Sequence, residues 1–549
     1  MVPKSLALLL SASTFLKTSF AADPDSDVVD TGYAKYLGNR TLPNAVAYLG
    51  IPYAEPPLGD LRFRAPVPLN TTRIAEESGG EAIDATEYPD FCIQGPLGRG
   101  DPRIDPGGAG SEDCLNLNIY APAGAKKGDN LPVLFYIHGG GYVNGNPQNW
   151  PFDHWIQQSP NIVAVSIYYR LDAFGFLTHP DFASSENGDL NPGFLDQVEA
   201  LRWVKANIES FGGDPSKVTI NGESAGGGSV QHHLVAEEGE PLFSGAIAQS
   251  VYRARTPTPE QQQPLFEHFA STAGCDSGDV AAQVACLRNA SVSTLVRAQE
   301  TQFNGSYNGF LPVIDGKVIV GHATTLVKEG KFAKVPLIVG ATSNETVSGG
   351  SNITVALQGS YPGLSDGDVQ DILAVAPLAD FANETQRFQD VTGESVLRCA
   401  REILGGAYST APKSWTYRYN QPSPVQSNPF GVEHAAENYM MFVGTDTGAN
   451  GSTTFHPTTP VEDAFAEELL AYWISFVRSG DPNTFKLDRS PEWPQYTLEG
   501  ADEIVKQRVV LQEGPADSTT ESGSFIEQEP VNEGRRCEAV AAKSEQEQN

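Results

Sequence analysis

Apolar runs of strand length alternate with amphipathic stretches along the middle of the chain. Residues Val133–Ile137 and Ile162–Tyr169 are two such runs, and they show the pattern of strands buried on both faces of a sheet. Between residues 191 and 211 the apolar positions take a helical period, and the Asn-Pro pair that opens this stretch is typical of a helix start. Gly212-Gly213-Asp214-Pro215 predicts the end of that helix, and a further strand is expected from Val218.

The same alternation continues downstream. Strands are expected at Val335–Gly340 and Ser414–Tyr419. One apolar helical stripe follows, ending near Gly480-Asp481-Pro482, and we interpret it as core; it consists of Val461, Phe465, Leu469, Trp473 and Phe476. Strands alternating with helices predict an α/β protein whose central, mostly parallel sheet is covered by helices on both faces.

Composition and chain ends suggest how the polypeptide is organised. Residues 1–21 resemble a secretory signal, because Lys4 precedes a short apolar stretch that is followed by small residues. We expect a catalytic domain over residues 22–511. The Glu-, Gln- and Ser-rich segment 512–549, which carries Cys537, is predicted to be a flexible acidic tail. The net charge of −32 disfavours nucleic acid and anionic membranes as partners, and no segment after the signal is long enough to span a membrane.

Sequons and cysteines agree with export from the cell. Eight Asn-x-Ser/Thr tripeptides occur, at Asn39, Asn70, Asn289, Asn304, Asn344, Asn352, Asn383 and Asn450. The six cysteines of an exported chain imply disulfides, although fifteen pairings are open to them; they are Cys92, Cys114, Cys275, Cys286, Cys399 and Cys537. Since Cys-x-x-Cys spacing is lacking, we expect no metal site.

The most informative motif is Gly222-Glu223-Ser224-Ala225-Gly226, directly after the β-branched run that begins at Val218. A Gly-x-Ser-x-Gly pentapeptide between a strand and a helix becomes a nucleophile elbow, a strained turn that exposes the serine hydroxyl at the end of a sheet strand. The glycines are needed because the neighbouring backbones approach too closely for side chains. We therefore predict that Ser224 is a nucleophile.

A nucleophilic serine needs a base, an acid and donors for an oxyanion. His138-Gly139-Gly140-Gly141 follows the strand Val133–Ile137, so the N–H groups of Gly140 and Gly141, with that of Ala225, are the expected donors. Glu345 follows the strand Val335–Gly340 and is the candidate acid, with a solvated surface charge as the alternative.

Nine histidines compete for the role of base. His434 lies downstream of the acid, and spacing favours it over His456 in a Pro/Thr-rich loop. His232 and His233 lie on the helix after Ser224 and are expected to point away or pack.

Further landmarks carry a family resemblance over roughly residues 28 to 485. They are Leu49-Gly50-Ile51-Pro52-Tyr53-Ala54, Ser111-Glu112-Asp113-Cys114-Leu115-Asn116, Asp196-Gln197, Leu201-Arg202-Trp203-Val204 and Phe211-Gly212-Gly213-Asp214-Pro215, beside the two glycine motifs. With these the chain resembles the type-B carboxylesterase/lipase family of α/β-hydrolases, which includes cholinesterases and fungal secreted esterases. The resemblance implies an α/β-hydrolase fold, and it implies the same triad and oxyanion donors: Ser224, Glu345 and His434 with Gly140, Gly141 and Ala225.

The resemblance also implies structural features. It pairs Cys92 with Cys114, Cys275 with Cys286, and Cys399 with Cys537. It assigns the ion pairs Arg62–Glu112 and Arg170–Asp196 to the scaffold, and gives Glu223 an electrostatic or structural role. One departure is Thr346, because the family usually has glycine after the acid.

We expect a secreted serine esterase that acts through an acyl-enzyme, without metal or cofactor. Its activity should fall as the pH drops through a histidine pKa near 6–7. The segment between Cys92 and Cys114, where the family has a lid, contains only Ile93, Leu97 and Ile104 as sizeable apolar residues, so soluble or moderately lipophilic esters are favoured. It also has no Trp, which disfavours choline esters. The alternatives are a lipase for long-chain acylglycerols or sterol esters and a non-catalytic adhesion-type relative. The oligomeric state is left open.

Overall fold

The computed structural model describes residues 27–95, 110–184, 187–236, 241–345, 350–409, 413–425, 431–447, 453–497, 506–515 and 518–549. The predicted signal segment, residues 1–21, lies outside this part of the chain. The strands are β1 (Val28–Asp30), β2 (Lys35–Leu42), β3 (Ala45–Pro52), β4 (Ala82–Ala85), β5 (Asn116–Pro122), β6 (Leu131–Ile137), β7 (Val163–Ile167), β8 (Gly213–Glu223), β9 (Gly245–Gln249), β10 (Leu337–Thr342), β11 (Ser414–Tyr419), β12 (Thr445–Thr447), β13 (Thr453–Phe455), β14 (Gln507–Leu511) and β15 (Phe525–Gln528).

Helices separate most of these strands. They are α1 (Thr71–Ser78), α2 (Asp153–Gln158), α3 (Asp172–Phe176), α4 (Pro192–Asn207), α5 (Ala225–Val235), α6 (Pro259–Thr272), α7 (Val280–Asn289), α8 (Val292–Glu300), α9 (Ala323–Lys328), α10 (Ile353–Ser360), α11 (Asp366–Ala374), α12 (Glu384–Gly393), α13 (Cys399–Tyr408), α14 (Glu437–Met441), α15 (Pro460–Ser479), α16 (Val531–Ala541) and α17 (Ser544–Glu547). A π-helical turn, η7 (Glu394–Arg398), joins α12 to α13.

Within the described residues one large mixed sheet dominates the fold. Its strand order is β1-β2-β3-β5-β7-β6-β8-β9-β10-β11-β14-β15, with β4 beside β2. The strands from β7 to β14 in this order run parallel, whereas the other neighbours along this order are antiparallel. Strand β4 is parallel to β2. The prediction of an α/β protein with a mostly parallel sheet is therefore confirmed.

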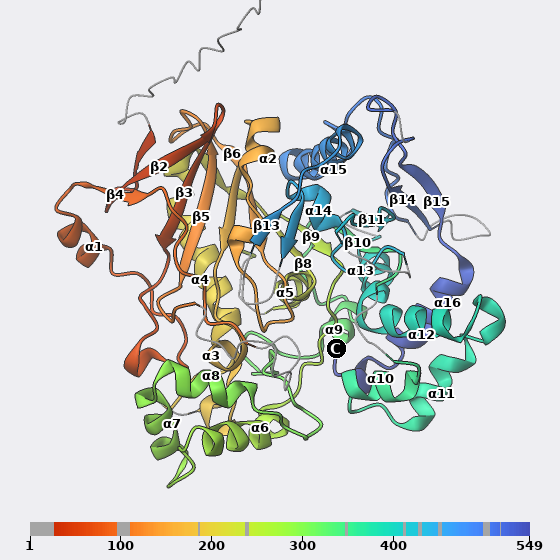
Figure 1. Ribbon diagram of the computed structural model, residues 1–549, viewed down its shortest axis with the longest axis horizontal. Helices are drawn as coiled ribbons and strands as arrows, with labels where there is room; N and C mark the ends of the chain where they lie inside the picture. The colour runs from red at the N-terminus through yellow and green to blue at the C-terminus, as the bar shows by residue number, and fades with distance from the viewer. Residues whose placement is uncertain are drawn as a thin grey trace, which may run out of the picture.

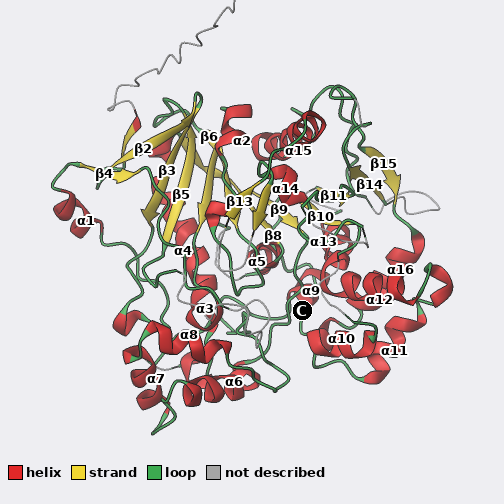
Figure 2. Cartoon of the chain, in the orientation of Figure 1, coloured by secondary structure: helices red, strands yellow, loops and turns green. Residues whose placement is uncertain are grey.

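Each face of the sheet has its own hydrophobic cluster, as expected for strands buried on both sides. Along β6 the side chains alternate, so that Val133, Phe135 and Ile137 join one cluster while Leu134 and Tyr136 join the other. Helices α4, α5, α9 and α13 pack on the first face, and α2, α14 and α15 pack on the second. Figures 1 and 2 show the strands gathered between these two groups of helices.

The helix boundaries follow local chemistry. Helix α4 starts with proline at its first position and continues through a 3₁₀ turn to Phe211, where Gly212 in the left-handed region ends it. Helix α15 begins with a capping box of Thr459 and Glu462 and ends at Gly480, so the predicted apolar helix is confirmed.

The C-terminal segment differs from the prediction of a flexible acidic tail. Its described residues form β15, α16 and α17, and α16 packs against α13 and α11 at the right of Figure 1. The composition was misleading because two glutamates of this segment are paired with arginines elsewhere in the chain: Glu533 with Arg401 and Arg508, and Glu547 with Arg253. Glutamates that a composition count treats as solvated are buried ion-pair partners in the folded chain.

Candidate active site

The predicted elbow is present at the junction of β8 and α5. Ser224 has φ 58° and ψ −120°, a strained conformation for a residue with a side chain. A Cβ atom on Gly226 would lie 2.0 Å from the carbonyl oxygen of Ile137, and one on Gly222 would lie 2.4 Å from the Gly226 backbone. Close packing around the turn therefore requires both glycines, and the fold holds the serine in its strained conformation.

Three segments that are distant in sequence meet at this turn. The Nε2 atom of His434 lies 2.8 Å from the hydroxyl oxygen of Ser224, and its Nδ1 atom lies 2.7 Å from Oε2 of Glu345. Glu345 is buried, whereas Ser224 retains 9% of its surface exposed. The structure thus brings together the three predicted residues in hydrogen-bond contact.

The carboxylate of Glu345 is fixed from its other side. The hydroxyl of Ser250 donates to Oε1 at 2.5 Å, and the backbone N–H of Thr342 donates to the same oxygen at 2.8 Å. Burial would raise the pKa of Glu345, but His434 and these donors together hold it below its usual value. Glu345 is therefore ionised and can stabilise a positive charge on the histidine.

Two further buried glutamates, Glu223 and Glu437, influence the charge of the imidazole. Glu223 lies 3.5 Å from Nε2 of His434, and Glu437 contacts Ser250 at 3.5 Å. Burial, together with the other carboxylates, raises the pKa of Glu223 to about 7 and that of Glu437 to about 8. Burial would lower the pKa of His434, but Glu345 and Glu223 outweigh it and raise this pKa to about 9, above the value near 6–7 expected from the sequence.

The glycine loop lies against the elbow, where oxyanion donors are needed. A Cβ atom on Gly139 would lie 2.9 Å from Cβ of Ser224. Gly140 has φ 101° and Gly141 has φ 66°, conformations that glycine adopts without strain. Ala225 is the first residue of α5, so its N–H belongs to the positive end of that helix. All three predicted donors thus belong to segments that border the serine.

The other histidines have separate environments. His456 lies 3.4 Å from Asp446 near the β12–β13 hairpin, so the rival base is not the one that contacts Ser224. His232 and His233 are buried on α5, as predicted. His138 is buried, and its ring stacks on Tyr169.

Sequence reasoning missed Ser250 and Glu437. Ser250 follows β9 at the carboxyl edge of the sheet, the same edge as Ser224, and this position was the signal that could have found it. Glu437 lies three residues after the histidine, and no local pattern distinguishes it from a surface glutamate.

The supporting features implied by the resemblance are present. Disulfides join Cys92 to Cys114, Cys275 to Cys286, and Cys399 to Cys537. The buried ion pairs Arg62–Glu112 and Arg170–Asp196 form with shortest N–O distances of 2.6 and 2.7 Å. Most of the predicted lid, including Leu97 and Ile104, lies outside the described residues, as does Thr346.

Two other features are absent from the described ranges, a metal-ligand cluster and a membrane-spanning helix. There, no group of three or more His, Cys, Asp or Glu side chains could hold a metal ion. Over the same part of the chain, no helix is both long enough and apolar enough to cross a membrane.

In the α/β-hydrolases a serine lies on a strand-to-helix turn at the carboxyl edge of a mostly parallel sheet, in contact with a histidine and a buried acid. This chain has the same arrangement. Comparison with known proteins identifies the family within this class. The model of the Carboxylesterase family matches residues 25–359 and 369–508. A carboxylesterase 1E from Mus musculus is 32% identical over 550 residues, covering 90% of this chain and 92% of the relative. Lipase 4 from Diutina rugosa is 31% identical over 548 residues, with the same two coverages.

Structural similarity agrees with the sequence comparison. EstA from Aspergillus niger superimposes with a TM-score of 0.80 and 31% identity, covering 95% of this chain and 99% of that one. The chain belongs to the carboxylesterase family and is a carboxylic ester hydrolase.

Proposed function

We propose that this protein is a secreted serine hydrolase that cleaves soluble or moderately lipophilic carboxylic esters through an acyl-enzyme. The observation that carries the proposal is the continuous contact from Ser224 through His434 to the buried carboxylate of Glu345, at 2.8 and 2.7 Å. Distances of this size allow a proton to pass between the hydroxyl and the imidazole.

Acylation begins with neutral His434. Its Nε2 atom takes the proton of the Ser224 hydroxyl as the oxygen bonds to the ester carbonyl, and the carbonyl electron pair moves to the oxygen. Glu345 stabilises the imidazolium that results. The oxyanion is bound by the N–H groups of Gly140, Gly141 and Ala225, each worth about 3–4 kcal/mol of transition-state stabilisation.

Collapse of this intermediate breaks the bond to the alcohol, which leaves with the proton from Nε2 of His434. A water molecule then attacks the acyl group, gives its proton to the same nitrogen, and the serine regains that proton as the acid departs. All of these proton transfers use the Nε2 atom of His434.

Secretion is supported by the signal-like residues 1–21 and by the absence of a free cysteine among the described residues, where the cysteines form three disulfides. The preference for soluble substrates rests on the few apolar residues between Cys92 and Cys114. A lipase is the second candidate, because Lipase 4 from Diutina rugosa is among the relatives.

Two comparisons test the proposal. The first sets wild type against Ser224→Ala on short-chain soluble esters, where the variant is expected to fold normally and lose nearly all turnover. Turnover retained by Ser224→Ala would exclude this serine as nucleophile. The second sets short-chain soluble esters against emulsified long-chain acylglycerols, and a rise in rate on the emulsion would favour the lipase instead.

A further inference from the structure

The turn that carries Glu345 rests on a helical run from a different part of the chain. This run consists of α12, the π-helical turn η7 and α13. The approach is close, because a Cβ atom on Gly393 would lie 1.8 Å from the carbonyl oxygen of Glu345. Single π-helical turns inside α-helices occur frequently at functional sites.

Arg398, at the end of η7, joins this run to the turn. Its Nη1 atom donates to the carbonyl oxygen of Ser343, while Nη2 donates to Asp390 at 3.1 Å and to Glu394 at 3.0 Å. Arg398 is buried, at 8% exposure. The two carboxylates therefore both compensate its charge and fix where its guanidinium points.

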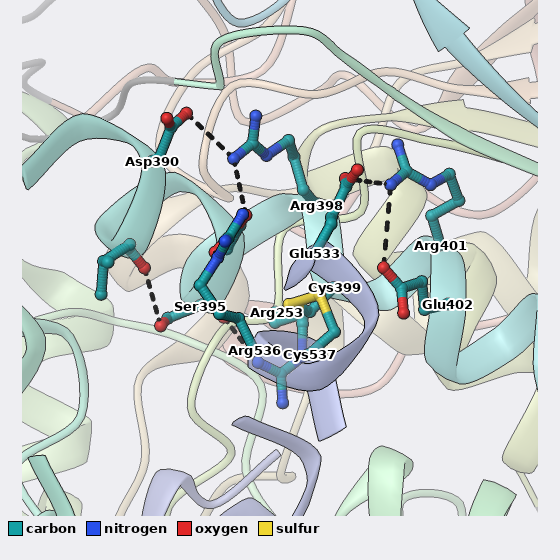
Figure 3. Close-up of a disulfide and its surroundings, with 12 residues drawn as sticks. Arg253, Asp390, Ser395, Arg398, Cys399, Arg401, Glu402, Glu533, Arg536 and Cys537 are labelled. Carbon is teal, nitrogen blue, oxygen red and sulfur yellow. Dashed lines mark hydrogen bonds and ion pairs between the residues drawn. A yellow bond between two sulfur atoms is a disulfide. The ribbon is translucent and has the colours of Figure 1, made fainter. Parts of the chain in front are cut away.

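The anchor of Arg398 is itself fixed by the C-terminal segment. Arg536 of α16 donates to Glu394 through two nitrogens, at 2.7 and 2.6 Å. The next residue, Cys537, forms the disulfide with Cys399, which directly follows Arg398. Figure 3 shows Arg398 and Arg536 near this disulfide, with Arg398 extended toward Asp390.

The peptide group that Arg398 binds is held on its other side by the histidine loop. The carbonyl of Ser343 and the N–H of Asn344 belong to one peptide, and that N–H donates to the carbonyl oxygen of Val432 at 2.9 Å. Val432 lies two residues before His434 and returns a bond, because its own N–H donates to the side chain of Asn344 at 3.2 Å. This single planar peptide thus joins the acid turn to the loop of the base.

We propose that Arg398 is a positioning residue of the hydrolase site, which clamps the Ser343–Asn344 peptide and so sets the separation between Glu345 and His434. It contacts none of the reacting atoms. Removing its donors takes away the bond to the carbonyl oxygen of Ser343. The N–H of Asn344 keeps its bond to Val432, and Ser343 keeps its contacts with Tyr419. The inference rests on the proposed function, since it concerns the proposed acid and base.

The test compares Arg398→Met and Arg398→Lys with a matched control, Arg401→Met. Arg401 lies on α13 of the same run and is buried, but its ion pairs are with Glu533 and Glu402 rather than with the acid turn. Turnover is measured per active site titrated with a phosphonate ester, on a short-chain soluble ester, together with the pH dependence of kcat/KM. The chemical shift of the proton between His434 and Glu345 is followed by NMR.

We expect Arg398→Met to lower kcat per titrated site about 10- to 100-fold, because displacement of a catalytic group by about 1 Å costs up to that factor. KM should change less than about threefold, and the acidic limb of the pH profile should move to lower pH as Glu345 withdraws from the imidazole. Arg398→Lys should recover part of the loss, since an ammonium can still donate to one carbonyl. Arg401→Met should lose thermal stability and keep kcat.

The proposal is overturned if Arg398→Met and Arg398→Lys keep the wild-type kcat per site, acidic limb and proton shift, or if Arg401→Met alters them equally. Should the methionine variant fail to fold, the lysine variant alone decides by the same criteria. Failure of the proposed function is a separate result: wild type and Ser224→Ala would then hydrolyse the ester equally. The NMR measurement needs no turnover, so it would still report on Arg398.

Discussion

Ser250 provides a test in which activity and stability should respond to different features of one residue. Its hydroxyl donates to Glu345 at 2.5 Å, whereas its backbone has φ 44°, an unfavourable conformation for any residue with a side chain. Ser250→Ala removes the hydroxyl and keeps the strain. Ser250→Gly removes both.

The magnitudes follow from these two features. A hydrogen bond to a charged group contributes about 1.5–3 kcal/mol, equivalent to about 10- to 150-fold in rate if all of it is lost in the transition state. Glu345 keeps the N–H of Thr342 as a donor, so we expect a loss near the lower end, about tenfold in kcat, for both variants. Glycine tolerates the positive φ, so Ser250→Gly should be more stable than Ser250→Ala by about 1 kcal/mol.

The assay combines kcat per titrated active site with urea unfolding of the same preparations. We expect Ser250→Ala and Ser250→Gly to lose the same factor in kcat, and Ser250→Gly to have the larger free energy of unfolding. If Ser250→Ala kept kcat within twofold of wild type, or if Ser250→Gly restored kcat, the claim that the Ser250 hydroxyl supports Glu345 would be wrong.

Three other predictions concern charge, cross-linking and modification. The neighbouring carboxylates raise the pKa of His434 to about 9, but Glu223 and Glu437 themselves take up protons near pH 7 and 8 and then no longer stabilise the imidazolium. The acidic limb of the pH profile of kcat/KM should therefore lie above pH 6.5 and below pH 9. Activity should fall as the pH drops through it, and Glu223→Gln should move it to lower pH; an unmoved limb would contradict the contact at 3.5 Å. Replacing Cys275 and Cys286 by Ser opens a cross-link spanning 11 residues, which should cost about 3 kcal/mol of unfolding free energy and leave kcat per site unchanged, as calorimetry and titration can show. Peptide mapping of protein from a secreting eukaryotic host should find Asn344 without glycan, because its side chain binds Val432. The exposed Asn383 serves as the comparison sequon.

Local patterns were sufficient for β6, β7, β8, β10 and β11 and for the turn that carries Ser224, but β9, which lies between β8 and β10, was not predicted. The helix from Pro192 to Phe211 and the strand Ser414–Tyr419 follow from period and from turn residues, and both are present with nearly the expected bounds. Strand β10 starts and ends two residues later than predicted, since an apolar run does not itself mark where pairing begins. The elbow could be predicted because its glycines are close to Ser224 in sequence.

What the sequence could not supply depends on contacts between distant segments. Ser250 lies 95 residues from Glu345, and Arg536 lies 142 residues from Glu394. Nothing near these residues in the sequence shows that they will be buried beside an opposite charge or an acceptor. The C-terminal segment has the composition of a flexible tail for the same reason: its Glu533 and Glu547 are neutralised by arginines that only the folded chain brings close.

The central claim is that Ser224 becomes acylated during turnover. The most direct measurement is mass spectrometry of enzyme mixed with a short-chain ester and quenched with acid within milliseconds, followed by peptide mapping. We predict one acyl group per molecule on the peptide containing Ser224, and none on the Ser224→Ala variant. An acyl group on any other residue, or turnover with no acylated protein at any quench time, would contradict the account.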